Sequence, residues 1–188
     1  MLTTCSRILF KPSVVQGQNL FQWLNIIFNK VDDERRKLVG PDRSCAEWLL
    51  RNGAFVKWRY EEEFVTDYKL PSDDVKLHIV EVDATESSIA HHGFAHFVGC
   101  KYIEKITFHK CFYLENEALK ELSVLKDCLL HIRICECPNI TEEGLAHLKA
   151  LTKLKKIRLS KLYYIKDRNQ IINDLQKALP NCNINFFD

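Results

Sequence analysis

One histidine and three cysteines recur at matching places in two segments of the chain, and these residue types could bind a metal or supply a nucleophile. The residues are His109 and Cys111 in the first segment, then Cys135 and Cys137 a further 26 residues on. A histidine beside a cysteine could hold a reactive thiolate, and the four side chains together have the ligand types of a zinc site. Both interpretations depend on which of these side chains point the same way.

The 26-residue spacing belongs to a repeat that continues through the second half of the chain. Apolar residues that could anchor short strands recur in steps of 26, 26, 25 and 27 residues, at Val80, Ile106, Ile132, Ile157 and Ile184. Residues 129–154 show a complete unit, with an apolar strand, a cysteine at the turn and leucines at helical spacing. This is the pattern of the cysteine-containing leucine-rich repeat. One unit cannot bury its own apolar face, so we predict an α/β fold: a short leucine-rich-repeat solenoid of four to five strand–helix repeats with parallel strands.

The first unit fits this frame less well than the others. The residues eight positions after the first four anchors are Ser88, Leu114, Ile140 and Ile165. Three of the four are large and apolar, whereas Ser88 is not. We therefore predict that the first unit is degenerate because it adjoins an N-terminal cap.

Strand alternation assigns the residues one and three positions after each anchor to the concave face of the solenoid. The first row is Glu81, Thr107, Arg133, Arg158 and Asn185, and the second row is Asp83, His109, Cys135, Ser160 and Phe187. Neighbouring strands lie about 4.8 Å apart, so His109 and Cys135 should be lateral neighbours. Cys111 and Cys137 should instead point toward the turns and the interior, where four zinc ligands could not converge. We interpret these two as stacked interior cysteines, with a redox-active pair drawn from Cys111, Cys135 and Cys137 as the alternative.

The concave face favours binding over catalysis. A His109–Cys135 dyad would need a third group to orient it and a site for an oxyanion, and the sequence indicates neither. We therefore expect no enzyme and no organic cofactor. The predicted partner-binding surface has Arg133, Arg158 and Lys161 facing acidic groups, with His109 and Cys135 at its centre.

The N-terminal third predicts a targeting segment followed by a cap. Residues 1–31 contain Arg7, Lys11 and Lys30 but no acidic residue, which is typical of a mitochondrial transit peptide. We assign residues 1–19 to that peptide, 20–73 to an N-terminal capping domain and 74–188 to the repeat domain. The cap is predicted to hold a helix over 20–37, a second helix with a capping box at Ser44, and a strand over 54–60.

Composition excludes several classes of protein. The formal net charge of +2 gives no reason to expect a nucleic-acid partner. The eight cysteines are not preceded by a secretory signal, so we interpret them as reduced thiols in the matrix or cytosol. No run reaches the roughly 18 apolar residues that a membrane-spanning helix needs.

Several segments resemble the factor B family, the s subunits of mitochondrial ATP synthase. The matching segments are residues 23–25, 28–32, 39–43, 47–51, 67–68, 83–85, 104–106 and 139–141. The resemblance implies a non-catalytic coupling or assembly factor, peripheral on the matrix side of the mitochondrial inner membrane. Its implied partners are subunits of the ATP synthase membrane sector or respiratory-complex assembly factors.

The resemblance also implies three kinds of site. The first is a Mg²⁺ site that the family forms with main-chain carbonyls, at positions that match Gly53 and Thr85 in this sequence. Asp83 nearby would favour a cation. The family's Cys-x-Cys dithiol matches the segment 109–111, which begins with His109, so this chemistry is predicted to be absent or moved to Cys135 and Cys137. An aromatic segment linked to membrane contact matches Phe21 and Trp23, which could instead pack against the cap.

Two other functions remain open. Cysteine-containing leucine-rich repeats also occur in substrate adaptors of ubiquitin ligases, which would need an F-box-like segment before the repeats. A thiol redox protein is the third possibility, and it would depend on Cys135.

Overall fold

The computed structural model describes the backbone of residues 15–188 and the side chains of residue 20 and residues 23–188. Most of the predicted transit peptide, residues 1–14, lies outside the described residues, as does the Phe21 side chain. The first helix, Val15–Asn29, crosses the predicted boundary at residue 19.

The chain has an α/β fold built on one seven-stranded, mostly parallel sheet in the order β2-β1-β3-β4-β5-β6-β7. The five strands from β3 to β7 run parallel, and β1 is antiparallel to both of its neighbours. The strands are β1 (Phe55–Trp58), β2 (Phe64–Val65), β3 (Ile79–Thr85), β4 (Lys105–His109), β5 (His131–Cys135), β6 (Lys156–Ser160) and β7 (Asn183–Phe187).

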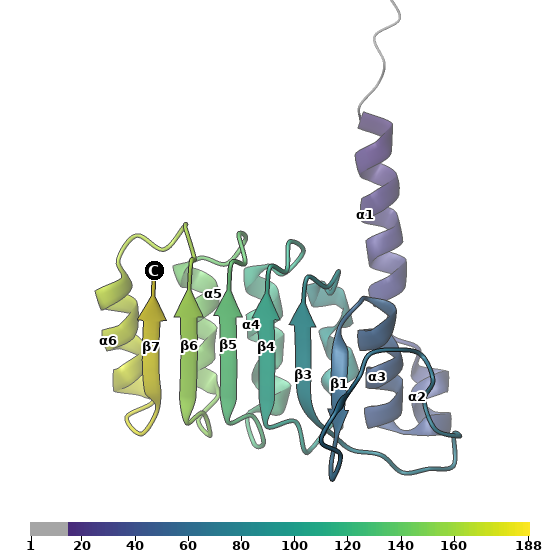
Figure 1. Ribbon diagram of the computed structural model, residues 1–188. Helices are drawn as coiled ribbons and strands as arrows, with labels where there is room; N and C mark the ends of the chain where they lie inside the picture. The colour runs from purple at the N-terminus through teal and green to yellow at the C-terminus, as the bar shows by residue number, and fades with distance from the viewer. Residues whose placement is uncertain (1–14) are drawn as a thin grey trace, which may run out of the picture.

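Helical segments connect the parallel strands and cover one face of the sheet (Figure 1). They are α4 (Asn116–Glu121) with η2 (Leu122–Leu125), α5 (Glu142–Ala146) with η3 (His147–Ala150), α6 (Arg168–Ala178), and the 3₁₀ helix η1 (His91–Phe97) after β3. We call the opposite face, which these helices leave uncovered, the open face. At the β1 end lie α1 (Val15–Asn29), which projects away from the sheet, α2 (Asp33–Val39) and α3 (Pro41–Arg51).

The lateral pairing of the strands corrects the predicted repeat frame. Val82, not Val80, pairs with Ile106, and the row continues through Ile132, Ile157 and Ile184 as predicted. With the anchor at Val82, the residue eight positions later is Ala90, which is buried like its counterparts in the next three units. The argument from Ser88 for a degenerate first unit therefore does not hold, although Ala90 is smaller than the Leu or Ile of the other units.

Every parallel strand from β3 to β6 ends in the same turn. The residue after the strand has a left-handed backbone with φ between 50° and 56°, and the four such residues are Glu86, Lys110, Glu136 and Lys161. The first three donate their N–H groups to the carbonyl of the last residue of the next strand. This turn sends the following side chain into the interior, so Ser87, Cys111, Cys137 and Leu162 are all buried at successive turns.

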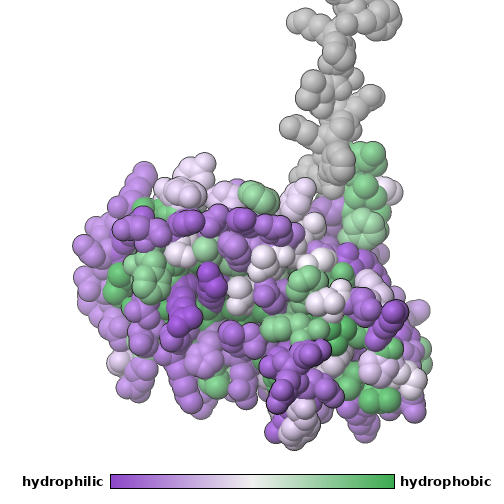
Figure 2. Space-filling model, in the orientation of Figure 1, coloured by the Kyte–Doolittle hydropathy of each residue, from purple (hydrophilic) through white to green (hydrophobic). Residues whose placement is uncertain are grey.

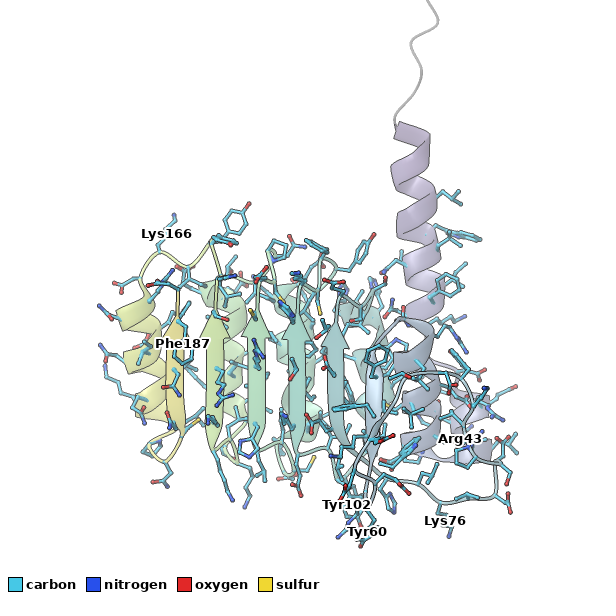
Figure 3. The ribbon with its side chains drawn as sticks, viewed as in Figure 1. Arg43, Tyr60, Lys76, Tyr102, Lys166 and Phe187 are labelled. Carbon is cyan, nitrogen blue, oxygen red and sulfur yellow. The ribbon has the colours of Figure 1, made fainter. Side chains whose placement is uncertain are left out.

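The cap differs from its prediction in three places. The expected helix over 20–37 is two helices, because Asp32 caps α2 by accepting a hydrogen bond from the N–H of Arg35 at 2.8 Å. Pro41 starts α3, which places Ser44 inside that helix instead of at its N-cap. The strand ends at Trp58, and Tyr60 turns outward at φ 74°, where the Arg59 guanidinium lies 5.0 Å from its ring centre and 4.8 Å from that of Tyr102 (Figure 3).

A buried polar network joins the end of α1 to the rest of the fold. The Asn29 side chain accepts hydrogen bonds at 3.0 Å from both the Trp48 indole N–H and the Ala90 backbone N–H. Its amide nitrogen donates to the Asn25 carbonyl at 2.9 Å and to the Asn52 side chain at 3.3 Å. Asn29 is fully buried, so these bonds replace water around its amide.

The helices of the described residues, 15–188, include none that is both long and apolar enough to cross a bilayer.

Candidate functional site on the open face

Two arginines lie side by side at the middle of the open face. Arg133 of β5 pairs laterally with Arg158 of β6, and both are exposed. Within the described part of the chain neither guanidinium forms an ion pair. Thr107 and Asn185 continue this row on either side, and Asp83 completes it in the position that had been predicted for Glu81. Glu81 lies two residues earlier on β3, opposite Lys105, with which it forms an ion pair.

The open face is hollowed around these arginines and is mainly hydrophilic there (Figure 2). A depression of about 650 Å³ is lined by His109, Arg133, Cys135, Glu136, Lys156, Arg158, Ser160, Lys161, Asn185, Phe187 and Asp188. A second depression of about 320 Å³ adjoins it over Lys105, Thr107, His131, Arg133, Lys156 and Arg158. Phe187 borders the first depression on the last strand (Figure 3). Basic side chains outnumber acidic ones in both depressions, so the surface favours an acidic ligand.

The positive charge of this surface also affects its titratable groups. Partial burial, together with Lys105, Lys155 and Lys156, holds the pKa of His131 below its usual value. The Lys161 ammonium lies 3.0 Å from a Glu136 carboxylate oxygen, so the pKa of Glu136 is lowered and that of Lys161 is raised. At neutral pH His131 is therefore uncharged, and the Glu136–Lys161 pair is ionised.

His109, Cys135 and Glu136 form a compact cluster at the carboxyl ends of β4 and β5. His109 and Cys135 are lateral neighbours, as strand alternation predicts. Cys135 is only 5% exposed, however, so it is covered and offers little surface for the predicted partner contact. Glu136 was not predicted as a site residue, yet its carboxylate oxygen lies 3.6 Å from His109 Nε2 and 4.0 Å from Cys135 Sγ.

Cys111 and Cys137 lie apart from this cluster, in the interior. Both are fully buried and free, and the Cys137 thiol donates to the Cys135 carbonyl at 3.4 Å. The neighbouring Cys111 thiol, together with burial, raises the pKa of Cys137, which keeps it protonated. Cys111 also donates to the Ala84 carbonyl at 2.8 Å. The arrangement matches stacked interior cysteines, and the four-ligand zinc arrangement is not formed.

Comparison with known proteins assigns the family. No family model matches the chain. Mitochondrial ATP synthase subunit s of the rat is 40% identical over 189 residues, covering 96% of this chain and 94% of the rat protein. The human protein of the same name is 40% identical over 174 residues, or 90% of this chain and 87% of the human protein. The chain belongs to the ATP synthase subunit s family. Bovine subunit s, at 40% identity over 163 residues, extends the relationship.

The two residues predicted to bind magnesium, Gly53 and Thr85, lie just beyond the paired part of β1 and β3. The β1–β3 ladder ends at the pair Phe55 and Asp83, two residues from each of them. Gly53 has φ 79°, a backbone conformation that suits glycine. The Asp83 carboxylate accepts hydrogen bonds from both the backbone and the hydroxyl of Thr85. Carboxylate and main-chain carbonyl oxygens are the ligand types that a hard cation accepts.

The segment predicted for membrane contact lies on α1. Trp23 is 57% exposed, and Leu20, Ile26, Ile27 and Phe28 are exposed as well. The coloured part of α1 is largely hydrophobic on the side that Figure 2 shows. More than half of the Trp23 side chain is therefore accessible.

Proposed function

We propose that this chain is a non-catalytic coupling or assembly factor that docks a partner on its open face. The main support is a pair of adjacent arginines, Arg133 and Arg158, at the centre of a hollowed surface. Neither has a carboxylate partner among the described residues. Membership of the subunit s family supports the membrane sector of mitochondrial ATP synthase as that partner. The proposed location is the matrix side of the inner membrane, reached through a targeting segment in residues 1–19.

The repeated strand–turn–helix units support their assignment as leucine-rich repeats. Each unit places an apolar strand anchor, a left-handed turn residue and a buried residue after the turn at the same positions. Residues 74–188 would form this repeat domain, with residues 20–73 as its cap. The exposed Trp23, together with Phe21, would seat α1 at the membrane surface.

Docking would proceed by charge pairing across the open face. An acidic segment of the partner would meet Arg133 and Arg158, whose guanidinium groups can each bind a carboxylate through two hydrogen bonds. Lys161, which is paired with Glu136, would add positive charge at the edge of the depression. Respiratory-complex assembly factors that expose such an acidic segment are the alternative partners.

Replacing both arginines, Arg133→Ala with Arg158→Ala, is expected to reduce recovery of membrane-sector subunits about tenfold, because two charge-assisted contacts are lost. The measurement is quantitative affinity purification from solubilised mitochondrial inner membranes. Neither residue is buried, so the melting temperature should change little. The matched control is Lys101→Ala with Lys126→Ala, which removes two exposed positive charges away from the open face. Equal recovery for the two double variants would exclude the open face as the docking surface.

We also propose that Mg²⁺ binds between Gly53 and Thr85, with water completing its coordination. A concentration ten times the dissociation constant should raise the free energy of unfolding by about 1.4 kcal/mol. Asp83→Asn keeps an acceptor oxygen for Thr85 but removes the negative charge, and it should reduce this stabilisation. Denaturant unfolding with and without Mg²⁺ measures the effect, with Asp127→Asn as the control for loss of one exposed carboxylate. An equal Mg²⁺ response in the two variants would argue against the site.

A further inference from the structure

The cluster of His109, Cys135 and Glu136 brings together three different metal-binding groups. The imidazole nitrogen, the thiol sulfur and a carboxylate oxygen all lie within 4.8 Å of one another. In a tetrahedral zinc site the ligand atoms are separated by about 3.3 to 3.7 Å, as follows from the usual zinc–ligand bond lengths. The observed separations from the Glu136 oxygen are 3.6 Å to His109 Nε2 and 4.0 Å to Cys135 Sγ. Small side-chain rotations would close the remaining difference.

The backbone supplies these ligands from fixed positions. His109 and Cys135 are the last residues of adjacent paired strands, so their spacing is set by the sheet. Glu136 follows in the left-handed turn, where its N–H is bonded to the Ser160 carbonyl at 3.2 Å. Ligands held on paired strands lose little conformational freedom on binding an ion, which favours a specific site.

From this geometry we propose that His109 Nε2, the Cys135 thiolate and the Glu136 carboxylate bind a zinc ion. Nitrogen, sulfur and oxygen ligands of these types suit Zn²⁺, and three protein ligands leave a fourth position for water or for a group on a partner. Cys111 and Cys137 are not part of the site, because they are fully buried at the interior turns, where their thiols donate to the main-chain carbonyls of Ala84 and Cys135.

Charge balance permits a cation in this otherwise basic depression. Binding breaks the S–H bond of Cys135, forms a zinc–sulfur bond and releases one proton to solvent. The thiolate and the carboxylate together then carry two negative charges, which balance the two positive charges of the ion. The ion must also displace Lys161, whose ammonium is paired with the same Glu136 oxygen. Lys161 is therefore a competitor of the metal.

Cobalt(II) is the probe for this site, because a thiolate bound to cobalt gives a charge-transfer absorption band in the near ultraviolet. Titration of the full reduced chain with CoCl₂ should develop this band, and Zn²⁺ should displace it. Cys135→Ser should abolish the band. His109→Gln and Glu136→Gln should each weaken cobalt binding by at least about tenfold, because each removes one of only three ligands.

Lys161→Met gives a test with the opposite sign. Removal of the competing ammonium should tighten cobalt binding by about two- to fivefold, the equivalent of an exposed ion pair. Lys126→Met is the charge control, and Cys128→Ser is the thiol control; both should bind cobalt like the unaltered chain.

Several results would overturn the proposal. They are the absence of a thiolate band in the full chain, a band that survives Cys135→Ser, or a band that disappears instead in Cys137→Ser. If Cys135→Ser does not fold, the two glutamine variants decide, since both of their side chains are partly exposed. Unchanged affinity in both of them would exclude the site. Circular dichroism of every variant distinguishes loss of binding from loss of structure.

Discussion

Asn29→Ala is expected to lower the free energy of unfolding by about 3 to 5 kcal/mol, because it leaves two buried donors without acceptors at about 1 to 3 kcal/mol each and removes two donated bonds. The stranded donors are the Trp48 indole N–H and the Ala90 backbone N–H. Trp48 is itself buried against Phe94, Phe97 and His96, so its N–H cannot turn toward water. Urea unfolding followed by circular dichroism measures the loss.

Asn25→Ala is the matched control for this prediction. Asn25 lies one turn earlier on α1 and donates one exposed hydrogen bond, to the Ser88 carbonyl at 2.8 Å. Its replacement should cost about 1 kcal/mol or less. If the two variants are destabilised equally, the buried network around Asn29 is not what joins α1 to the fold.

Acidification is expected to destabilise the protein through His96, and His96→Phe should remove that contribution. His96 is buried and stacks on Trp48 with the ring planes at 7°, and burial lowers its pKa from the ordinary 6.5 to about 4. Its Nε2 donates to the Lys30 carbonyl at 3.3 Å, whereas its Nδ1 has no partner, so a second proton would create an uncompensated buried charge.

The direction of the pH effect follows from the lowered pKa. Between pH 6.5 and 4 the unfolded chain takes up a proton on this histidine and the folded chain does not, so stability falls as the pH falls. The unaltered chain should lose about 2 to 3 kcal/mol more than His96→Phe between pH 7 and pH 4. The variant keeps the stacked ring but should be about 1 kcal/mol less stable at pH 7, because the bond to Lys30 is lost.

Denaturant titrations at several pH values measure this difference. His147→Phe, a change at a histidine of η3 outside the Trp48 contact, is the control. Parallel pH profiles for His96→Phe and the unaltered chain would show that His96 is not the group responsible.

The repeat period and the parallel sheet could be predicted from the sequence because strand anchors recur regularly and one unit cannot stand alone. The position of the first anchor could not be predicted in this way. Ile79, Val80 and Val82 are all apolar and lie close together, so several frames bury apolar side chains, and pairing with Ile106 decides between them. That pairing is a contact between two units, and the residues of one strand alone do not reveal it.

The cap was harder to predict because its helix ends depend on competing local signals. A helical composition runs through residues 20–37, but Asp32 can cap a new helix only once the chain has turned at the buried Asn29. At α3 two start signals compete, and Pro41 at the first turn prevails over the Ser44 capping box.

The open-face arginines were predictable from strand alternation, whereas Glu136 was not. It follows the strand in a left-handed turn, so alternation assigns it to neither face. A usable signal was present all the same: Glu86, Lys110, Glu136 and Lys161 occupy one position of successive units and alternate in charge, which predicts lateral pairing. The structure shows Lys110 paired with Glu86 and Lys161 with Glu136.

The two outer edges of the sheet differ, and this limits how copies of the chain can associate through backbone hydrogen bonds. The edge at β2 is a strand of only two residues, too short to template another strand, whereas β7 has five. Among the strands of residues 15–188, such an association is therefore expected to join β7 to β7 about a two-fold axis and to close as a dimer.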